Sequence, residues 1–295
     1  MEVLLTGASG FLGSIIRKSL CENIFTLSRE LSDYRCNLQS EVPDFRRRFE
    51  LIIHAAGKAH SIPKTEVEAK SFFDVNVKGT KNLLDGLEKV NSLKSFVFIS
   101  SVAVYGIDKG ERISEEADLS ARDPYGLSKI EAEKLVQEWC YKNHIICTIL
   151  RLPLIAGPNP PGNLRAMTRG IKRGYYFNIA GGRTRKSMVL AEDVAKVIPI
   201  VAETGGIFNL TDGYHPSFAE ISRLIARQLG KTGPGSMPYS LAKAMALLGD
   251  IGGKRFPLNS IKLNKIVSDL TFDDSKARRL IEWIPTPVLD GFKIA

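Results

Sequence analysis

Residues 3–13 read VLLTGASGFLG, and this stretch decides the fold. Residues 3–6 are a short apolar run, and beyond the glycines Ile15, Ile16 and Leu20 recur at helical spacing. A strand, a glycine turn and a helix in this order form the setting that a dinucleotide-binding loop requires. Glycines let the backbone approach a pyrophosphate, and the helix N-terminus supplies N–H donors. The spacing is G-x-x-G-x-x-G with no following Gly-Lys-Ser/Thr, which excludes a nucleotide triphosphatase loop.

Further apolar runs predict the other strands of a buried parallel sheet. They are residues 24–27, 51–54, 96–99 and 145–150, with a late strand at 208–210. Helical patterns separate them, the longest from about residue 65 to 90, with its apolar residues on one face. This alternation predicts an α/β fold with a doubly wound parallel sheet, in which ligands lie outside the carboxyl ends of the strands.

Several polar residues follow these strands. Ser28-Arg29 favours NADP, because an Arg at this place accommodates a 2′-phosphate, whereas the neighbouring Glu30 favours NAD. Lys58 either reaches a cofactor phosphate or is an exposed loop lysine. Asn76 lies on the apolar face of its helix, and a buried amide needs partners. It either orders neighbouring loops or touches the cofactor, and we favour a place near the cofactor.

Residues 123–129 read DPYGLSK and predict a catalytic pair. Asp123 is a good N-cap and Pro124 suits the first helical position. Tyr125 and Lys129 then leave the same helix face one turn apart. The ammonium group and the positive end of the helix dipole are expected to lower the phenol pKa, so that Tyr125 becomes a base near neutral pH. The alternative is an exposed helix with an unremarkable Tyr and Lys.

Composition limits the function further. The chain has 295 residues, 44% of them apolar, and no run approaches the ~20 apolar residues that span a bilayer. Its four cysteines are scattered, which predicts reduced thiols in a cytoplasmic protein, not a disulfide framework or a zinc site. His54 and His60 have no ligand set around them, so we expect no metal.

The net charge of +9 is unevenly distributed. No acidic residue lies between Glu138 and Glu192, whereas nine Lys and Arg side chains do. Such a stretch is either a solvated basic surface or a site for an anionic ligand. No helix-turn-helix, zinc-finger or RNA-recognition pattern is present, so a phosphorylated small molecule fits better than nucleic acid.

Five motifs in register give the chain a resemblance to a known family. They are the glycine loop, Ala55-Ala56-Gly57, Asn76-Val77-x-Gly79-Thr80, Ser100-Ser101-x-x-Val104-Tyr105-Gly106 and Tyr125-x-x-x-Lys129. Together they resemble the extended short-chain dehydrogenase/reductase family. The resemblance implies a Rossmann domain formed by residues 1–152 and 184–211. It also implies a smaller, interleaved substrate domain formed by residues 153–183 and 212–295.

The resemblance also implies roles for individual residues. The catalytic residues would be Ser101, Tyr125 and Lys129, with Ser101 orienting the substrate oxygen. NAD or NADP would be bound by Gly7, Ser9, Gly10, Phe11, Leu12, Gly13, Ser28, Arg29, Ala55, Ala56, Gly57, Lys58, Asn76, Ser100, Tyr125, Lys129 and Pro153. A diphosphate-linked sugar would be bound by Asn163, Leu164, Arg183, Arg185 and Lys186. Bidentate guanidinium pairing suits a diphosphate, but the sequence leaves open which of the last three residues provides it.

Three functions remain in competition. The dehydratases of the family carry an Asp-Glu pair where this chain has Val102-Ala103, so dehydration is not expected. The C-terminal segment is similar to polyprenyl-diphosphate-N-acetylglucosamine 4-epimerases, which favours a 4-epimerase of a nucleotide- or polyprenyl-linked hexose or N-acetylhexosamine. An NADPH-dependent 4-keto-sugar reductase would use the same residues. A non-catalytic NADP-sensing protein is the remote alternative, because such modules commonly lack the Tyr/Lys pair.

Residues 237–249 read MPYSLAKAMALLG and are too short to cross a membrane. They are either the core of the substrate domain or an interfacial element flanked by Lys243, Lys254 and Arg255. The second interpretation predicts peripheral membrane contact if the substrate carries a lipid. The family resemblance also predicts a homodimer formed through helices near residues 65–90 and 124–143.

Overall fold

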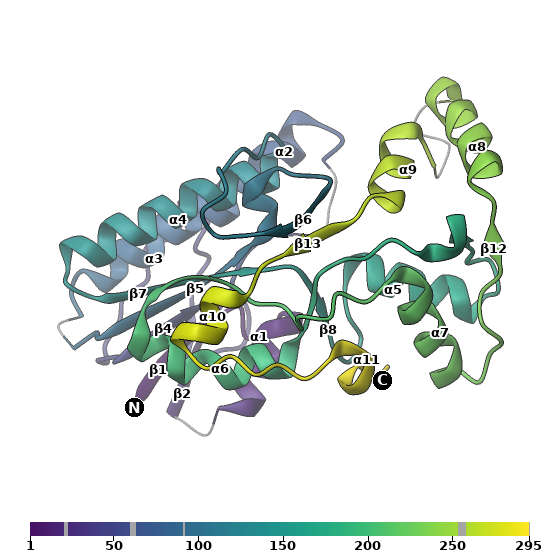
Figure 1. Ribbon diagram of the computed structural model, residues 1–295. Coiled ribbons are helices and arrows are strands. Elements are labelled where there is room, and N and C mark those ends of the chain that lie inside the picture. The colour runs from purple at the N-terminus through teal and green to yellow at the C-terminus, as the bar shows by residue number, and fades with distance from the viewer. Residues whose placement is uncertain (21–22, 60–62, 91, 253–257, 295) are drawn as a thin grey trace.

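A computed structural model describes residues 1–20, 23–59, 63–90, 92–252 and 258–294. Its central feature is a sheet of seven parallel strands (Figure 1). In spatial order these are β3 (Tyr34–Arg35), β2 (Asn23–Ser28), β1 (Glu2–Thr6), β4 (Leu51–His54), β5 (Ser95–Ser101), β7 (Ile146–Leu152) and β11 (Gly206–Asn209). The order reverses between β1 and β4, as in a doubly wound fold, so the predicted fold class is confirmed.

Helices cover both faces of this sheet. One face carries α1 (Phe11–Ser19) and α6 (Ala191–Thr204), and the other carries α3 (Gly79–Leu87) and α4 (Pro124–Lys142). Leu4 and Leu5 of β1 belong to opposite cores, because successive side chains of a strand point to opposite faces. This explains why the strands read as continuous apolar runs and not as alternating ones.

The predicted helix over residues 65–90 is interrupted in its middle. Thr65 caps α2 (Glu66–Phe73), a π-helical turn η1 (Asp74–Lys78) follows, and the chain continues directly into α3. A π-helical turn shifts the residues after it around the helix axis, and such turns are frequent at functional sites. The turn contains Asn76, whose side chain is buried.

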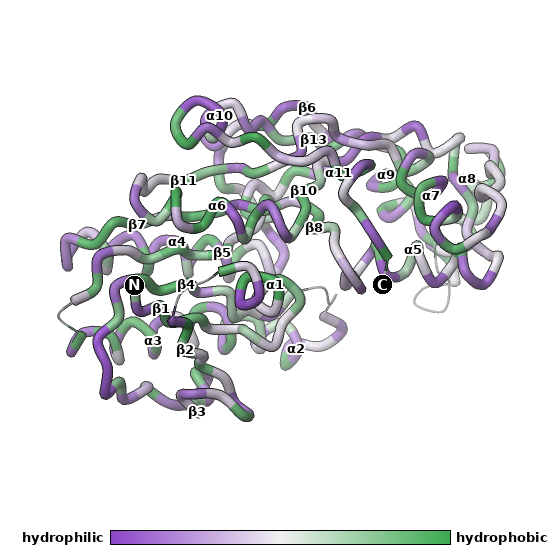
Figure 2. Tube along the Cα trace, turned by 90° about the horizontal axis from the view of Figure 1, so that it is seen from below, coloured by the Kyte–Doolittle hydropathy of each residue, from purple (hydrophilic) through white to green (hydrophobic). Residues whose placement is uncertain are grey.

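All seven sheet strands come from residues 1–152 and 184–211, which we call the sheet lobe. Residues 153–183 and 212–295 are here called the second lobe; most of it extends away from the sheet, whereas residues 275–280 lie over the sheet (Figures 1 and 2). The second lobe contains α5 (Gly162–Lys172), α7 (Phe218–Gln228), α8 (Tyr239–Gly252), α9 (Ser260–Val267), α10 (Ser275–Leu280), α11 (Val288–Gly291) and the short turn η3 (Ala180–Gly182). We propose this division as the domain organisation of the chain.

Short strands connect the two lobes. β8 (Leu154–Ala156) pairs with β10 (Met188–Leu190), and β13 (Leu270–Phe272) pairs with β6 (Gly110–Ile113). A third pair, β9 (Asn178–Ile179) with β12 (Ser236–Met237), lies within the second lobe. In the first two pairs one strand comes from each lobe, so the lobes are interleaved through backbone hydrogen bonds.

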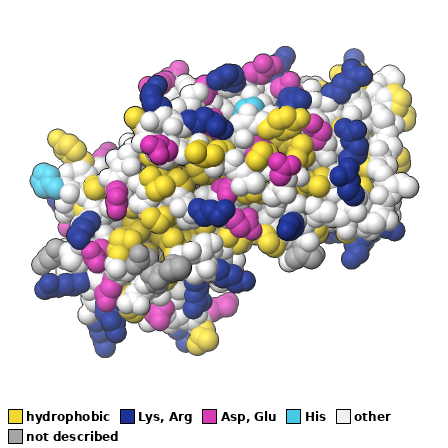
Figure 3. All heavy atoms as spheres, turned by 60° about the horizontal axis from the view of Figure 1, so that its bottom comes forward, with side chains coloured by type: hydrophobic (Ala, Val, Ile, Leu, Met, Phe, Trp, Pro, Cys, Tyr) yellow, Lys and Arg dark blue, Asp and Glu magenta, His cyan; other side chains and the backbone are white. Residues whose placement is uncertain are grey.

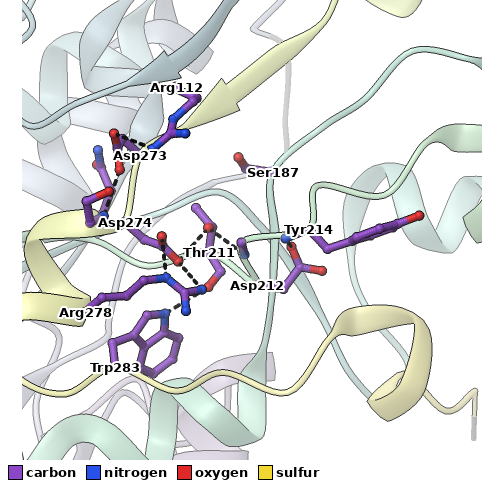
Figure 4. Close-up of polar contacts among 12 residues, drawn as sticks. Arg112, Ser187, Thr211, Asp212, Tyr214, Asp273, Asp274, Arg278 and Trp283 are labelled. Atoms are coloured by element: carbon purple, nitrogen blue, oxygen red, sulfur yellow. Dashed lines mark hydrogen bonds and ion pairs between the residues drawn. The ribbon is translucent and has the colours of Figure 1, made fainter.

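The chain after β13 packs back onto the sheet lobe. Trp283 donates its indole N–H to the carbonyl of Thr211 at 2.9 Å, and the Thr211 hydroxyl bonds Asp274 at 3.0 Å (Figure 4). Arg278 forms a two-point ion pair with the same Asp274 carboxylate. Ala277, Ile281 and Trp283 belong to the hydrophobic core that covers the α1 and α6 face. Residues 275–283 therefore complete the core of the sheet lobe.

The apolar stretch 237–249 does not form the core of the second lobe. It lies in α8, which buries only a stripe of small residues, Ala242, Ala246 and Gly249, against α9. The outer arc of the helix is exposed, so the core interpretation is wrong for this arc. Lys254, Arg255, His60 and Cys21 lie outside the described residues. Across those that are described, no helix is both long and apolar enough to cross a membrane.

Candidate active site

The glycine loop lies at the point where the strand order reverses. Gly7 follows β1 with a φ of +74°, and its backbone packs directly on the chain after β4. A Cβ at Gly7 would lie 2.6 Å from the backbone nitrogen of Ala56, which no side chain tolerates. No side chain of the described structure caps α1, whose N-cap is Gly10, so its N-terminal N–H groups remain available to an anion.

A cavity of about 530 Å³ opens beside this loop. The predicted residues that line it are Gly7, Ser9, Gly10, Ser28, Arg29, Ala55, Ala56, Gly57 and Lys58. The other residues predicted to contact the cofactor do not line it: Phe11, Leu12, Gly13, Asn76, Ser100, Tyr125, Lys129 and Pro153. Leu12 instead packs into the core, and Phe11 lies against Gly157.

One wall of this cavity is not among the residues predicted from the sequence. Cys36, Asn37, Leu38 and Gln39 follow the two-residue strand β3 and line the cavity opposite the glycine loop. Burial raises the pKa of the Cys36 thiol to about 11, so this thiol is neutral. The strand is too short to produce a periodic signal, which is why this wall was not found.

A second hollow of about 340 Å³ adjoins the end of β2. Its lining consists of Arg29, Glu30, Leu31, Ser32 and Arg35. Arg29 was predicted from its position after β2, whereas Arg35 comes from β3 and was not predicted. Two guanidinium groups and a hydroxyl are the groups that bind a phosphate, and Glu30 opposes a second negative charge.

His54 connects the cofactor cavity to Asn76 through hydrogen bonds. The Thr6 hydroxyl accepts the Ala56 N–H at 3.1 Å and contacts His54 Nδ1 at 2.6 Å. His54 Nε2 contacts the Thr80 hydroxyl at 2.9 Å, and that hydroxyl donates to the Asn76 carbonyl at 2.6 Å. Because Thr80 uses its proton there, His54 Nε2 must donate and Nδ1 must accept. Burial, reinforced by Lys129, lowers the His54 pKa to about 3, so the ring is neutral.

The Asn76 side chain joins the cavity wall to α4. Its Oδ1 accepts the Lys58 N–H at 2.7 Å, and its Nδ2 donates to the Lys58 carbonyl and to Ser128 Oγ. Ser128 in turn donates to the Tyr125 carbonyl at 2.8 Å. Asn76 thus orders the neighbouring loops, which is the first of the two interpretations, while its contact with the cofactor stays a prediction. The Lys58 ammonium group donates to Ser71 and lies over the Phe72 ring.

The start of α4 is formed as the sequence predicts. Asp123 Oδ1 accepts the N–H groups of Tyr125 and Gly126, both at 3.1 Å, and Pro124 occupies the first turn. A Cβ at Gly126 would lie 2.5 Å from Ala121 Cβ and 2.8 Å from the Ala103 carbonyl oxygen. The glycine therefore allows α4 to approach the turn after β5, which brings Tyr125 next to Ser101.

Tyr125 is half-buried, with its ring against Phe72 at a centroid distance of 6.0 Å. Burial raises its pKa above the ordinary value of 10.0, and hydrogen bonding with Ser101 partly offsets this rise. The predicted lowering of the pKa is therefore not observed, because loss of hydration outweighs the Ser101 hydrogen bond. Asp123 also favours the neutral phenol, because its negative charge repels a phenolate.

Lys129 is almost fully buried one turn further along α4. Its ammonium nitrogen donates to the Ile99 carbonyl at 2.7 Å and lies 4.1 Å from the centre of the Phe98 ring. A Cβ at Gly57 would lie 4.0 Å from it, so the amine reaches the wall of the cofactor cavity. Burial lowers its pKa to about 7, although Glu133 opposes the shift. Amine and ammonium forms are therefore both populated near neutral pH.

Two adjacent serines end β5 and face different surroundings. Ser101 Oγ accepts the Ala103 N–H at 3.2 Å and also hydrogen-bonds Tyr125. Ser100 Oγ instead donates to the buried carboxylate of Glu133. A cofactor contact from Ser100 would therefore have to come from its backbone.

Glu133 and Arg151 form a buried ion pair behind the two serines. Arg151 Nη2 lies 2.8 Å from Glu133 Oε2, and Arg151 Nη1 donates to the Tyr105 hydroxyl at 3.2 Å. Tyr105 in turn donates to Asn209 at 2.8 Å. This chain of hydrogen bonds joins α4, β7 and β11 below the candidate catalytic residues. The sequence gives no local signal for these hydrogen bonds, because the residues that form them lie far apart in the chain.

The predicted substrate residues lie in the second lobe and at its junction with the sheet lobe. Leu164 is buried in the core of the second lobe, whereas Asn163 is exposed at the start of α5. Arg185 donates to the His215 carbonyl at 3.0 Å, and Lys186 donates to the Ser268 carbonyl at 2.8 Å. Arg183 is exposed, and its side chain has no hydrogen bond or ion pair to any residue that the structure describes.

Residues 3–211 match the NAD dependent epimerase/dehydratase family. The chain belongs to this family. Members are enzymes of the extended short-chain dehydrogenase/reductase type that use NAD or NADP, and both the resemblance and the cofactor class are confirmed. Homologues of the chain act on sugars linked to a nucleotide or another diphosphate carrier.

Two curated relatives cover most of the chain at similar identity. One is the N-acetyl-alpha-D-glucosaminyl-diphospho-ditrans,octacis-undecaprenol 4-epimerase of Escherichia coli O157:H7, which is 28% identical over 93% of this chain and 88% of its own. The other is the UDP-glucose 4-epimerase of Vibrio cholerae, which is 28% identical over 99% of this chain and 93% of its own.

Solved structures support the same fold. The UDP-glucose 4-epimerase of Thermotoga maritima with UDP-glucose has a TM-score of 0.74 at 21% identity, covering 97% of this chain and 94% of its own. RMD of Pseudomonas aeruginosa complexed with NADPH has a TM-score of 0.70 at 20% identity, with the same coverage.

Proposed function

We propose that this protein is a 4-epimerase of a hexose or N-acetylhexosamine that is linked through a diphosphate to a nucleotide or a polyprenyl carrier. The observation that carries the proposal is the hydrogen bond between Ser101 and Tyr125, one helical turn before Lys129, whose amine reaches the wall of the glycine-loop cavity at Gly57. Two relatives that span the chain are named as 4-epimerases of such sugars, one on each kind of carrier.

The cavity fits a nicotinamide dinucleotide. The closely packed Gly7 turn and the N-terminus of α1 suit a pyrophosphate, and residues 36–39 suit an adenosine half. The bound cofactor would supply hydride acceptance from C4 of the sugar and hydride return to the opposite face of the same carbon.

The protein residues would handle the proton of the C4 hydroxyl. Tyr125 would have to act as the phenolate, a form that its raised pKa makes scarce. Its Oη would take the proton in the first half-reaction and give it back in the second, so one turnover consumes no net proton. Ser101 donates a hydrogen bond to the same substrate oxygen. Lys129, held by the Ile99 carbonyl, would supply positive charge one helical turn after Tyr125 and would reach the cofactor at Gly57.

The diphosphate would be bound in the second lobe. Arg183 is the strongest candidate, because its guanidinium is exposed and has no polar partner within the described chain. Arg185 and Lys186 already donate to backbone carbonyls, so they would shape the site more than bind the ligand. Asn163 and the backbone of Leu164 would contact the carrier near the start of α5.

One observation favours the 4-keto-sugar reductase as a second candidate. The hollow with Arg29 and Arg35 suits the 2′-phosphate of NADP, and a net reductase draws on NADPH. An epimerase instead retains its cofactor through many turnovers and needs no external reductant.

The test begins with identification of the nucleotide released from denatured, purified protein. The protein is then incubated with UDP-N-acetylglucosamine and with undecaprenyl-diphospho-N-acetylglucosamine without added cofactor. The epimerase predicts interconversion at C4 of at least one substrate and retention of bound NAD or NADP. An empty protein that is inactive alone, and that reduces a 4-keto sugar with NADPH, would instead establish the reductase.

We also propose a homodimer formed by the outer faces of α2, α3 and α4, as the family resemblance implies. If the carrier is a polyprenyl lipid, the enzyme must work at a bilayer surface, and we propose peripheral contact with the cytoplasmic face of the membrane.

A further inference from the structure

The outer arc of α8 carries apolar side chains where a surface helix normally carries polar ones. Leu241, Met245, Leu247, Leu248 and Ile251 are exposed at 52%, 38%, 52%, 59% and 87%. With 3.6 residues per turn, these positions spread over about 160° of the helix, opposite the small residues that face α9. Exposed apolar residues grouped in this way mark an interaction surface.

The position of α8 leaves this arc accessible. The α8–α9 pair projects from the end of the second lobe, away from the sheet (Figure 1). Lys265 of α9 pairs with Asp108 of the sheet lobe at 2.9 Å, and Lys186 donates to the Ser268 carbonyl just after α9. The hairpin is thus attached next to the basic residues that were assigned to the diphosphate.

Charge indicates whether this surface binds a second copy of the chain or an anionic surface such as a lipid bilayer. The chain has 41 Lys and Arg and 32 Asp and Glu. Of these, 17 basic and 8 acidic residues lie in the second lobe, which leaves 24 basic and 24 acidic residues in the sheet lobe. The whole excess of +9 therefore belongs to the second lobe. In Figure 3 its Lys and Arg side chains cross the lobe in a column with few acidic side chains near them. Like charge opposes pairing of two such lobes, whereas an anionic surface attracts them.

We propose that the outer arc of α8 docks on an anionic lipid bilayer, with the helix lying in the plane of the interface. The apolar side chains enter the boundary between headgroups and acyl chains, and Lys243 and the basic surface of the lobe face the lipid phosphates. The helix has 14 residues, too few to span the bilayer. This proposal rests on the proposed function only in its purpose, which is to bring the active site to a lipid-linked sugar diphosphate.

The test is co-sedimentation of the full chain with vesicles of phosphatidylcholine and phosphatidylglycerol at a ratio of 3:1. We expect binding in 100 mM NaCl that falls at least fivefold in 500 mM NaCl or on phosphatidylcholine alone, because salt screens the electrostatic part. Ile251→Glu and Leu248→Glu should each weaken the partition at least tenfold. Far-ultraviolet circular dichroism and NADH or NADPH binding establish that these variants are folded.

Ile284→Glu is the matched control, since Ile284 lies in the same lobe, is 88% exposed and undergoes the same change of charge. It should bind vesicles like the unchanged protein. Equal binding by Ile251→Glu, or an equal loss in Ile284→Glu, would overturn the proposal. Light scattering tests the alternative, in which the arc binds a second copy of the chain. If Ile251→Glu halves the mass in solution and the unchanged protein ignores vesicles, the arc pairs with a second copy.

The two proposals fail separately. If vesicle binding depends on α8 but only UDP-sugars are epimerised, the proposed membrane-docking surface is supported and the polyprenyl carrier is rejected. If the polyprenyl substrate is epimerised but the protein does not bind vesicles, the 4-epimerase function is supported and membrane docking by α8 is rejected.

Discussion

The two lobes differ in their charge and in how deeply their candidate functional residues are buried. The sheet lobe has as many acidic as basic residues, and its candidate catalytic groups are fixed by a buried network around Asn76, His54 and Glu133. The second lobe carries all of the net charge and an exposed apolar helix, and its basic candidates lie at the surface or bond to backbone carbonyls.

This difference separates chemistry from the choice of substrate. Proton transfer needs groups held to within a fraction of an ångström, which buried hydrogen bonds provide. Attraction of a diphosphate or a bilayer needs only charge and apolar area, which a surface provides without fixed geometry. Changes in the sheet lobe should therefore alter turnover and stability, whereas changes in the second lobe should alter binding.

The largest effect is expected for Tyr125→Phe. Loss of the phenol oxygen should lower kcat by about 10²–10⁴-fold, the usual contribution of a general acid/base. Cofactor affinity should stay within twofold, which equilibrium titration measures. Tyr141→Phe, on the same helix but 87% exposed, is the control and should leave kcat unchanged. Full activity of Tyr125→Phe would remove the catalytic role and revive the sensor alternative.

Glu133→Gln tests whether the buried network supports the sheet lobe. It leaves the guanidinium of Arg151, which is 3% exposed, without its carboxylate, and such losses cost about 3–5 kcal/mol of unfolding free energy. The double variant Glu133→Leu/Arg151→Met should recover much of this loss in urea unfolding. An additive loss in the double variant would contradict the pairing.

Lys129 links stability to pH. Its pKa falls from 10.5 to about 7 on folding, so between these values the unfolded chain holds a proton that the folded chain lacks. The unfolding free energy should therefore rise with pH across this window, by on the order of 3 kcal/mol relative to Lys129→Met. Lys134→Met, an exposed position of α4, should show no such pH-dependent difference.

The smallest effect concerns the choice between NADP and NAD. Arg29→Ser and Arg35→Ser should each lower the preference for NADPH over NADH about tenfold, or ~1.4 kcal/mol, if the hollow at β2 holds a 2′-phosphate. The ratio of the two dissociation constants measures this effect, with Arg48→Ser as the exposed control. Unchanged ratios would assign the hollow no part in cofactor choice.

Local motifs made the sheet and the start of α4 predictable. The Gly7 turn, the Asp123 cap and the strands at residues 51–54 and 95–101 follow from short-range patterns. The direction of the Tyr125 pKa shift was not predictable, because it depends on how much protein surrounds the phenol. The Glu133–Arg151 pair, the wall at residues 36–39 and the exposed arc of α8 likewise depend on tertiary packing.

The return of residues 270–283 to the sheet lobe has a consequence for synthesis. β13 pairs with β6 from some 160 positions earlier in the chain, and Trp283 closes the core against Thr211. During translation, part of the core of the sheet lobe therefore stays uncovered until residue 283 has left the ribosome exit tunnel. Nascent chains stalled before this point should recruit chaperones, and those stalled well beyond it should resist protease.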